Sequence, residues 1–194
     1  SQQQEESTPT PTPSFDPKQI KIVNGNVVRQ VPNAETKILV NKDDHKSTGI
    51  TGFAKVIVSP DNLRFCFEAW PPAPAPALYI SDIEGSEVTK IGENYKNCTW
   101  SSDGAKLAYI NSAAQDKPAN IFVYDIVSGK EKNVTLAKQT ETVKKAYGII
   151  GLSADSTKLL CNYTILNTVT TEEEKTEGTC EVDWKTLAIT EEEI

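Results

Sequence analysis

Hydrophobic and polar residues alternate along this chain in short runs that recur in the same order. Three segments share an apolar residue, then Ser, a variable residue, Asp, a turn residue and a mostly apolar run. These segments are residues 58–67, 100–109 and 152–161. Short runs that are rich in aromatic and β-branched residues and bounded by turn residues predict β-strands.

Each segment is followed by a second shared pattern, a strand-sized run with an Asp near its end. These second runs are residues 78–83, 121–126 and 179–184. The whole unit repeats after roughly 40–50 residues and holds four strand-sized runs, which is typical of one blade of a β-propeller. Three such units are expected at about residues 52–92, 96–137 and 147–192.

The most conspicuous residues of each unit are its aspartates, among them Asp61, Asp103 and Asp155. Such carboxylates are compatible with acid–base pairs or with calcium binding. Their fixed place in every unit favours a structural role, because Asp and Ser side chains accept backbone N–H bonds in turns. We therefore expect Ser-x-Asp to form the turn between the first and second strands of a blade.

The chain upstream of the three units supplies part of a further blade. Residues 19–31 form a predicted hairpin, because its Asn24-Gly25 pair is preferred in two-residue hairpin turns. This hairpin matches the last two strands of a blade, with Asn24 in the place of Asp82. Residues 36–41 are another strand candidate. The expected fold class is all-β and β-propeller-like, with about three and a half to four four-stranded blades.

This blade count leaves two architectures open. Propellers usually close with about four to eight blades, so either a compact four-bladed ring forms or the ring stays open and a partner completes it. The first blade has no evident inner strand. Residues 36–41 of the same chain, or the N-terminal segment of a neighbouring chain, are the two candidates to supply one.

Two regions are expected, a disordered Thr/Pro-rich stalk at residues 1–17 and a propeller-like domain at residues 18–194. The first 14 residues contain no apolar residue larger than Pro, so they bury too little surface to offset the entropy of ordering. The chain has no Met, even at position 1, which fits removal of a signal peptide. We therefore expect a secreted or cell-surface protein.

One repeated segment resembles a known family. Residues 100–109 read Trp-Ser-Ser-Asp-Gly-Ala-Lys-Leu-Ala-Tyr and resemble the WSPDGxxLAF blade motif of TolB-like β-propellers. Residues 58–61 and 152–155 are weaker copies of this motif. The resemblance covers about residues 18–190 and implies binding or scaffolding outside the cytoplasm.

The four cysteines make an even count that is compatible with two disulfides. They lack the CxxC spacing of zinc sites and the chain has a single His, so no metal site is expected. Their strand positions predict a Cys161–Cys180 bridge across one hairpin and a Cys66–Cys98 bridge between neighbouring blades. Four buried thiols are the alternative. The stalk favours an oxidising compartment, and hence the disulfides.

Three Asn-x-Thr sequons, which begin at Asn97, Asn133 and Asn162, are candidate glycosylation sites. Asn133 and Asn162 lie near predicted strand ends, whereas Asn97 adjoins a cysteine of an inner strand. Asn133 is therefore the best candidate and Asn97 the weakest.

Charge and composition exclude several classes of function. A formal net charge of -7 argues against a nucleic-acid-binding surface, and no run of 18 apolar residues is present to insert into a membrane. There is no Gly-rich phosphate loop, and the only His, His45, lies in a polar segment typical of an exposed loop. No catalytic residue and no cofactor are therefore expected.

The remaining aromatic and loop positions have simpler explanations. Trp70, Trp100 and Trp184 lie within or beside strands, so we expect all three to pack in the core. The Pro-rich residues 71–76 and the long, Thr-rich residues 167–178 are predicted to be loops between the second and third strands of their blades.

The expected function is a non-enzymatic, extracellular β-propeller scaffold or protein-interaction module, whose partner is another protein or a second copy of the chain. Incomplete blades leave strand edges that can accept a strand from a neighbour. The alternative is therefore a structural subunit of an extracellular, glycosylated filament or surface layer assembled by strand donation. A third possibility, from a different class, is a hydrolase or lyase that uses carboxylates on a propeller face.

Overall fold

The computed structural model of the chain describes residues 15–70, 77–111, 119–135, 140, 142–167 and 174–194. In this part of the chain the fold consists of β-strands and two short 3-10 helices, η1 (Pro17–Gln19) and η2 (Lys42–Thr48). None of its helices has the length and apolar character needed to cross a membrane. Residues 71–76 and most of the expected stalk, residues 1–14, lie outside the described residues.

The strands form four antiparallel sheets, which we number in chain order. Sheet 1 consists of β1 (Ile20–Val23), β2 (Asn26–Arg29) and β3 (Lys37–Val40). Sheet 2 consists of β4 (Gly52–Val58), β5 (Arg64–Trp70), β6 (Ala77–Asp82) and β7 (Val88–Glu93). Sheet 3 consists of β8 (Tyr95–Trp100), β9 (Lys106–Asn111), β10 (Ile121–Asp125) and β11 (Lys130–Asn133). Sheet 4 consists of β12 (Val143–Leu152), β13 (Lys158–Asn167), β14 (Glu174–Asp183) and β15 (Ile189–Glu193).

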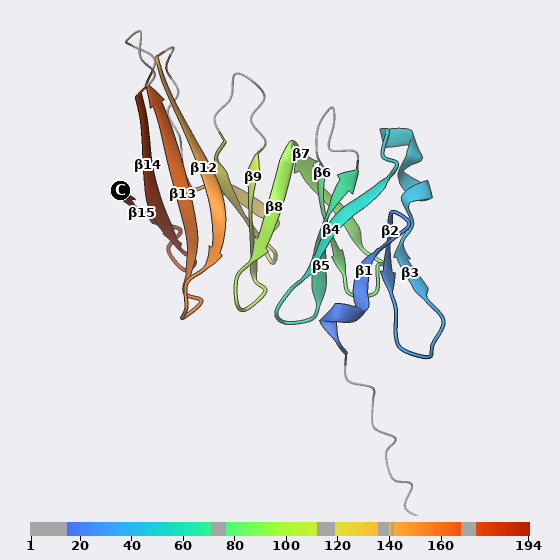
Figure 1. Cartoon of the computed structure of the whole chain (residues 1–194). Coiled ribbons are helices and arrows are strands. Elements are labelled where there is room, and N and C mark those ends of the chain that lie inside the picture. The colour runs from blue at the N-terminus through green and yellow to red at the C-terminus, as the bar shows by residue number, and fades with distance from the viewer. Residues whose placement is uncertain (1–14, 71–76, 112–118, 136–139, 141, 168–173) are drawn as a thin grey trace, which may run out of the picture.

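Within each sheet every strand pairs with its neighbours in the sequence, so each sheet is an up-and-down meander. The four sheets stand side by side with their faces together, as the blades of a propeller do (Figure 1). The expected all-β, propeller-like class is therefore confirmed.

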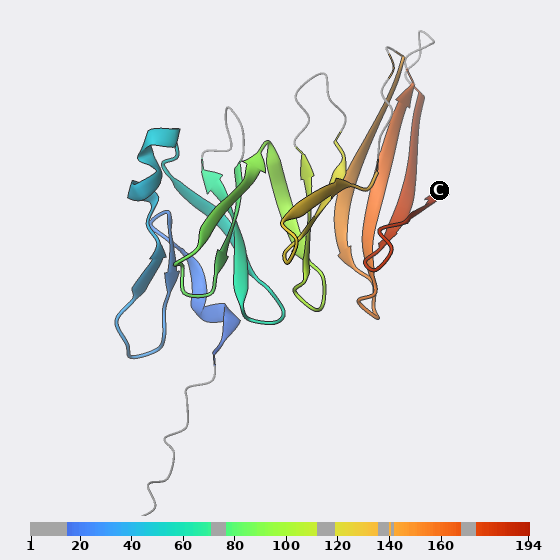
Figure 2. The same ribbon diagram turned by 180° about the vertical axis from the view of Figure 1, so that it is seen from behind.

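The row of sheets is open. Sheet 1 lies at one end and sheet 4 at the opposite end, and both views show sheets 2 and 3 between them (Figures 1 and 2). The described residues thus form an open row rather than a closed four-bladed ring, and completion of the ring by a partner stays a prediction.

Three hydrophobic cores fill the spaces between the sheets. The core between sheets 1 and 2 includes Val27, Phe53, Phe65, Phe67 and Tyr79. The core between sheets 2 and 3 includes Cys66, Leu78, Trp100, Leu107 and Tyr109. The core between sheets 3 and 4 includes Ala108, Ile121, Val123, Leu159 and Val182. Because successive side chains of a strand point to opposite faces, the middle strands of sheets 2 and 3 contribute to two cores each.

Sheet 1 differs from the sequence expectation in the places that its strands occupy. β1 and β2 run in the same directions as β5 and β6, and the turn between them lies at the upper end of sheet 1 (Figure 1). They therefore hold the second and third places of a blade, and β3 holds the fourth. The expected correspondence of Asn24 with Asp82 is wrong. Gly25 explains the placement, since its C=O accepts a bond from the Phe53 N–H at 2.8 Å and ties this turn to β4.

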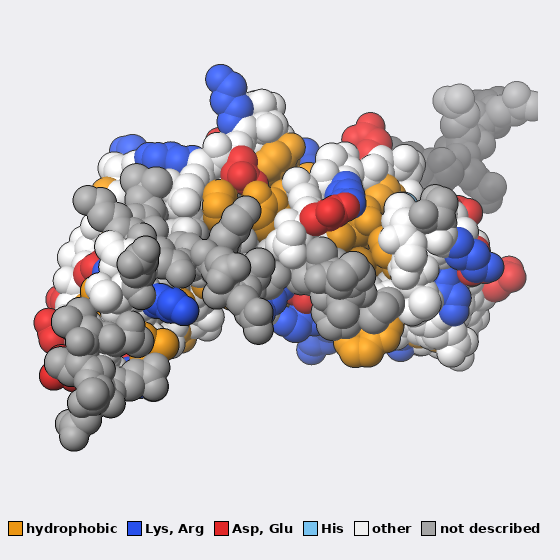
Figure 3. Space-filling view, turned by 90° about the horizontal axis from the view of Figure 1, so that it is seen from above, with side chains coloured by type: hydrophobic (Ala, Val, Ile, Leu, Met, Phe, Trp, Pro, Cys, Tyr) orange, Lys and Arg blue, Asp and Glu red, His pale blue; other side chains and the backbone are white. Residues whose placement is uncertain are grey.

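Two further expectations need correction. The loop predicted at residues 167–178 is shorter, because β13 extends to Asn167 and β14 begins at Glu174. Residues 36–41 form a strand, β3, but at the outer edge of sheet 1, where they cannot supply an inner strand. Seen from above, hydrophobic side chains of the described residues surface in small separate patches between charged ones (Figure 3).

Candidate functional site

Three places in the described structure could carry a function: the row of Ser-x-Asp turns, the outward face of sheet 4 and the free edge of sheet 1. Each is built from the strands described above.

The three Ser-x-Asp turns share one hydrogen-bond network. In sheet 3 the Ser101 hydroxyl donates to the Asp103 carboxylate at 2.6 Å and accepts from the Lys106 N–H at 2.9 Å. The same carboxylate oxygen accepts from the Ala105 N–H at 3.0 Å. Ser59 with Asp61, and Ser153 with Asp155, repeat this arrangement.

These bonds stabilise the ionised carboxylates. Hydrogen bonds from Ser153 and Thr157 lower the pKa of Asp155 to about 2, and the bond from Ser101 lowers the pKa of Asp103. A carboxylate with a depressed pKa that already accepts several donors is a poor general acid. The structure therefore supports the turn role that the repeat predicts.

The aspartates that end the third strands are engaged in the same way. The Asp82 carboxylate accepts the N–H groups of Ser86 and Glu87 at 2.7 and 2.8 Å. Asp125 accepts from Ser128, and Asp183 accepts from Thr186. Each of these aspartates makes the turn into the fourth strand of its sheet.

Two glutamates on outer strands are held by tyrosines. Tyr109 donates to Glu131 in sheet 3, and Tyr147 donates to Glu191 in sheet 4. Glu191 also forms an ion pair with Lys145. Burial alone would raise the pKa of Glu191, but the bonds from Lys145 and Tyr147 outweigh it and lower that pKa. These carboxylates are structural partners within one sheet.

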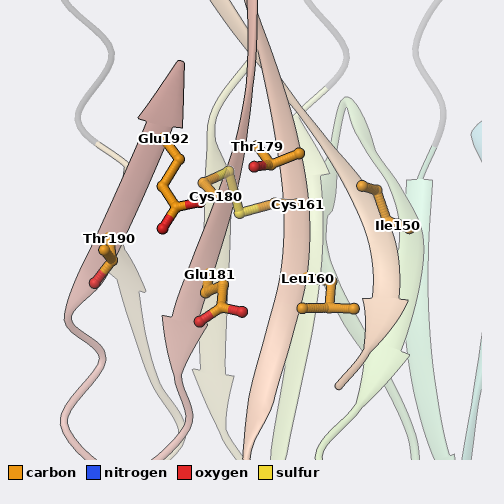
Figure 4. Close-up of a pocket in the computed structure, with 8 residues that line it drawn as sticks. All are labelled: Ile150, Leu160, Cys161, Thr179, Cys180, Glu181, Thr190 and Glu192. Carbon is orange, nitrogen blue, oxygen red and sulfur yellow. A yellow bond between two sulfur atoms is a disulfide. The ribbon is translucent and has the colours of Figure 1, made fainter. Parts of the chain in front are cut away.

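The outward face of sheet 4 is the second candidate place, and we call it the end face. A hollow of about 190 Å³ lies on it, and Figure 4 shows the residues that line it. The residues that line it are Ile150, Leu160, Cys161, Thr179, Cys180, Glu181, Thr190 and Glu192. Ile150 is 60% exposed. The Glu181 carboxylate pairs with Lys158, so the hollow combines two apolar side chains with a polar rim.

The positions of sheets 2 and 3 that are equivalent to the end face carry more apolar residues than the end face does. Counted from the Asp of the Ser-x-Asp turn, Leu160 and its cross-strand partner Glu181 correspond to Ala108 and Val123 of sheet 3. In sheet 2 the corresponding pair is Cys66 and Ile80. Two residues earlier on the third strand, sheet 4 has Thr179 where sheet 3 has Ile121 and sheet 2 has Leu78. The end face is therefore built for contact with water or a polar partner rather than for another stacked sheet.

Potential metal ligands do not cluster in the described part of the chain. Among the described residues, no three His, Cys, Asp or Glu side chains come together as potential metal ligands. His45 is half-buried in η2 and packs edge-on against Phe53 and Tyr79, so the expected exposed loop position is wrong. Its ring fills part of the core between sheets 1 and 2.

The four cysteines form two disulfides. Cys66 and Cys98 connect sheets 2 and 3, with their Cα atoms 6.7 Å apart. Cys161 and Cys180 face each other across the β13–β14 hairpin, with their Cα atoms 4.8 Å apart. No cysteine is free. These are the pairs that the strand positions predict.

The three sequon asparagines occupy different environments. Asn162 is exposed on the end face. Asn97 is partly buried, and its side-chain oxygen accepts a bond from the Lys55 ammonium at 2.7 Å. Asn133 is also partly buried, at the end of β11. Accessibility therefore favours Asn162 over Asn133 as a glycosylation site, and glycan attachment itself stays a prediction.

The tryptophans fall into two groups. Trp100 and Trp184 are buried, as expected, and the Trp100 indole N–H donates to the Ile57 C=O at 3.0 Å across the gap between sheets. Trp70 is 53% exposed at the end of β5, so core packing is the wrong expectation for it.

Sheet 1 is the third candidate place. Among the described residues it has three strands where each other sheet has four, and the first place is the one not occupied. β1 therefore has a neighbour, β2, on one side only among the described residues. The sheet is held to sheet 2 by Arg29, which donates to the Ile83 C=O and forms an ion pair with Glu84 at 2.9 Å.

Comparison with known proteins defines the class at the level of the fold. No family model matches the chain, and neither does any curated protein. The solved structures that resemble it include an oligogalacturonate lyase in complex with manganese, with a TM-score of 0.59, 13% identity, and coverage of 87% of this chain and 47% of the lyase.

A peptidase and the β-propeller domain of a protease are also similar. Dipeptidyl peptidase 4 of Porphyromonas gingivalis matches at a TM-score of 0.57 and 13% identity, over 90% of this chain and 31% of the peptidase. The β-propeller domain of the Trilobed protease from Pyrococcus furiosus, which has an open velcro topology, matches at a TM-score of 0.50 and 15% identity. The match covers 73% of this chain and 42% of the protease domain. The chain thus spans less than half the length of these structures.

The fold is therefore that of a β-propeller, of which the described residues form four blades, one with three strands and three with four. TolB from Acinetobacter baumannii is similar at 11% identity, over 85% of this chain and 36% of TolB, but its TM-score of 0.47 is too low to support an argument. The β-propeller class therefore rests on the other solved structures, and the resemblance to TolB-like propellers stays a prediction from the sequence.

Proposed function

We propose that this chain is a non-enzymatic, propeller-type scaffold or protein-interaction module that acts outside the cytoplasm. The observation that carries the proposal is the state of its carboxylates. The recurring aspartates accept turn N–H groups, and Glu131 and Glu191 accept tyrosine hydroxyls. Groups engaged in this way stabilise the blades and leave surfaces and strand edges as the places for binding.

The two disulfides support a site of action outside the cytoplasm. Cytosolic reductants keep most thiols reduced, whereas disulfides persist in secreted and periplasmic proteins. Both bridges in this chain join cysteines that lie in the cores between sheets. They connect strands that are already packed together, which is the arrangement expected of structural disulfides.

Trapping of thiols in native cells tests the location. Cells are quenched in acid, and the protein is alkylated in denaturant without reduction and then again after reduction. We expect no alkylated cysteine before reduction and four after it. Four cysteines alkylated before reduction would contradict action in an oxidising compartment.

An enzyme of the lyase or peptidase kind is the competing class, because such enzymes share the fold. The test is to incubate the purified full chain with oligogalacturonate and Mn²⁺, and separately with a peptide library. We expect no turnover above that of the heat-unfolded chain. Turnover that is abolished by substitution of a single carboxylate would refute the non-enzymatic assignment.

A structural subunit of an extracellular filament or surface layer is the second candidate function. The specific observation in its favour is the incomplete sheet 1, since an open strand edge is a template for pairing with another chain. Exposure of the Asn162 sequon is compatible with a glycosylated surface protein. Sedimentation of the full chain at rising concentration distinguishes an assembling subunit from a monomeric module.

A further inference from the structure

The free edge of β1 carries backbone groups that point away from sheet 1. The Gln30 N–H donates to the Gln19 C=O at 2.8 Å, so the backbone of Gln19 faces β2. The backbone N–H and C=O groups of alternate residues in a strand point to the same side, so those of Lys21 and Val23 also face β2. The backbone N–H and C=O of Ile22 and the C=O of Ile20 therefore face the open side.

In the other three sheets the same edge of the second strand is covered by a first strand. Arg64, which begins β5, accepts the Ser59 N–H through its C=O, and Lys106 and Lys158 accept from Ser101 and Ser153 in the same way. Ile20 stands in the place of these residues. No described residue bonds the Ile22 backbone from the open side.

The free edge of β1 lies beside the core between sheets 1 and 2. The Ile20 side chain is only 5% exposed and packs between sheets 1 and 2. Each backbone group left without a partner away from water costs about 1–3 kcal/mol. A strand that covered the edge would satisfy these groups and complete a four-stranded blade.

The sequence of residues 8–13, Thr-Pro-Thr-Pro-Thr-Pro, suits this place. In a strand the Thr backbone groups would all point to one side and the Pro residues to the other. The Thr side could bond β1, while the Pro side, which has no N–H, would face away and accept no further strand. The alternation also matches the spacing of Ile20 and Ile22, which are two residues apart.

We propose that the free edge of β1 binds residues 8–13 of a second copy of this chain, which then serve as the missing first strand of sheet 1. The inference rests on the proposed interaction function and names the partner. A head-to-tail contact of this kind generates chains of molecules unless it closes into a ring.

The local structure before β1 favours a second copy over the molecule's own segment. In sheets 2–4 a Ser-x-Asp turn folds the first strand back on the second. Here η1 precedes β1, with Asp16 as its N-cap. The Arg29 Cζ lies over the Phe15 ring, 5.2 Å from the ring centroid. The chain enters β1 through this anchored helical turn instead of a hairpin.

Amide hydrogen exchange of a labelled acceptor tests the proposal directly. The acceptor is the full chain, ¹⁵N-labelled, with Thr8→Pro, Thr10→Pro and Thr12→Pro, so that its own segment offers no N–H to β1. The donor is the unlabelled full chain. We expect the donor to slow exchange of the Ile22 amide by about tenfold or more, while the Lys21 amide, which already faces β2, is unchanged.

Two donor variants serve as matched controls. A donor with the same three Thr→Pro substitutions should leave Ile22 exchange unchanged. A donor with Pro9→Ala, Pro11→Ala and Pro13→Ala keeps every Thr N–H and should protect Ile22 as well as the unsubstituted donor does.

Two results would overturn the proposal. Fast exchange of Ile22 in the acceptor at every donor concentration, combined with slow exchange in a labelled unsubstituted chain at all dilutions, would assign the edge to the molecule's own segment. Fast exchange in both would show that residues 8–13 do not pair with β1. Neither result bears on the thiol-trapping test, so failure here is distinguishable from failure of the proposed function.

Discussion

The inner sheets and the last sheet of this propeller treat equivalent faces differently. Sheet 3 turns Ala108 and Val123 toward the next sheet, whereas sheet 4 turns Leu160 and Glu181 toward solvent at the same two positions. The geometry of the strands alone therefore does not indicate whether another sheet packs on the outward face of a blade. The side-chain types on the outward face decide it, as in the terminal repeats of other stacked folds.

The two ends of the row also differ from each other. Sheet 4 has the longest strands, with three of ten residues, and a polar outward face. Sheet 1 has strands of four residues and lacks its first strand among the described residues. The described residues of sheet 4 thus present a polar face, whereas those of sheet 1 leave one edge of β1 unpaired.

The largest expected effect comes from two adjacent leucines on opposite faces of β13. Leu159 is fully buried against sheet 3, whereas Leu160 lies partly exposed on the end face. We expect Leu159→Ala to lower the free energy of unfolding by about 2–5 kcal/mol and Leu160→Ala by about 1 kcal/mol or less. Denaturant unfolding measures both. Equal losses would mean that the end face is buried in solution.

Removal of one disulfide is the next largest perturbation. Replacement of both Cys66 and Cys98 by Ala should lower the free energy of unfolding by about 2–4 kcal/mol. Replacement of Cys161 and Cys180 should cost less, because the bridge closes a shorter loop, with a sequence separation of 19 rather than 32. Calorimetry of the two double variants against the oxidised chain decides the order, and the reverse order would show that strain or local packing dominates.

The dependence of the free energy of unfolding on acid pH tests the role of the Ser153–Asp155 turn. The folded pKa of Asp155 is about 2, below its ordinary value of 3.8, so the unfolded chain binds the proton more tightly. Its contribution is complete above about pH 4 and is lost as the pH falls toward 2. Asp155→Asn should flatten the loss of stability in this window. Ser153→Ala, which removes the main hydrogen-bond donor, should flatten it in part. An unchanged acid profile in both variants would contradict the turn role.

The smallest effect on stability is expected on the end face itself. Thr179→Ile with Glu181→Val copies the residue types of sheet 3 onto sheet 4, at the positions of Ile121 and Val123. We expect a change in unfolding free energy within about 0.5 kcal/mol but a clear gain in self-association by sedimentation. Lys132→Val, on the exposed strand β11, is the control. If association is unchanged, polarity of the end face is not what ends the stack.

Much of this fold follows from local patterns that tertiary packing did not alter. The Ser-x-Asp spacing identifies the turns, because a Ser and an Asp two residues apart can satisfy the same group of N–H donors in any blade. The cysteine pairs follow from strand pairing, since Cys161 and Cys180 are directly opposite. These features depend only on residues near one another in one hairpin or in adjacent blades.

Other features depend on contacts that no short pattern contains. An Asn24-Gly25 turn specifies a hairpin but not its place in a blade. That place depends on the approach of Gly25 to Gly52, where a Cβ on Gly25 would lie 3.1 Å from the Gly52 Cα. Likewise, His45 sits in a polar stretch, yet η2 carries its ring onto Phe53. The polarity of the end face is a difference between equivalent positions of sheets 2, 3 and 4, and no single segment of the sequence contains it.

The row of sheets is open, and its two end faces lie apart (Figures 1 and 2). Spin labels on non-canonical residues at positions 21 and 190 place one label on the outward face of sheet 1 and one on the end face. Pulsed electron resonance on the dilute full chain should give a separation spanning the row, well beyond the roughly 10 Å between neighbouring sheets. A dominant short separation, near that of adjacent sheets, would show that the ends meet in a closed ring and would contradict the account.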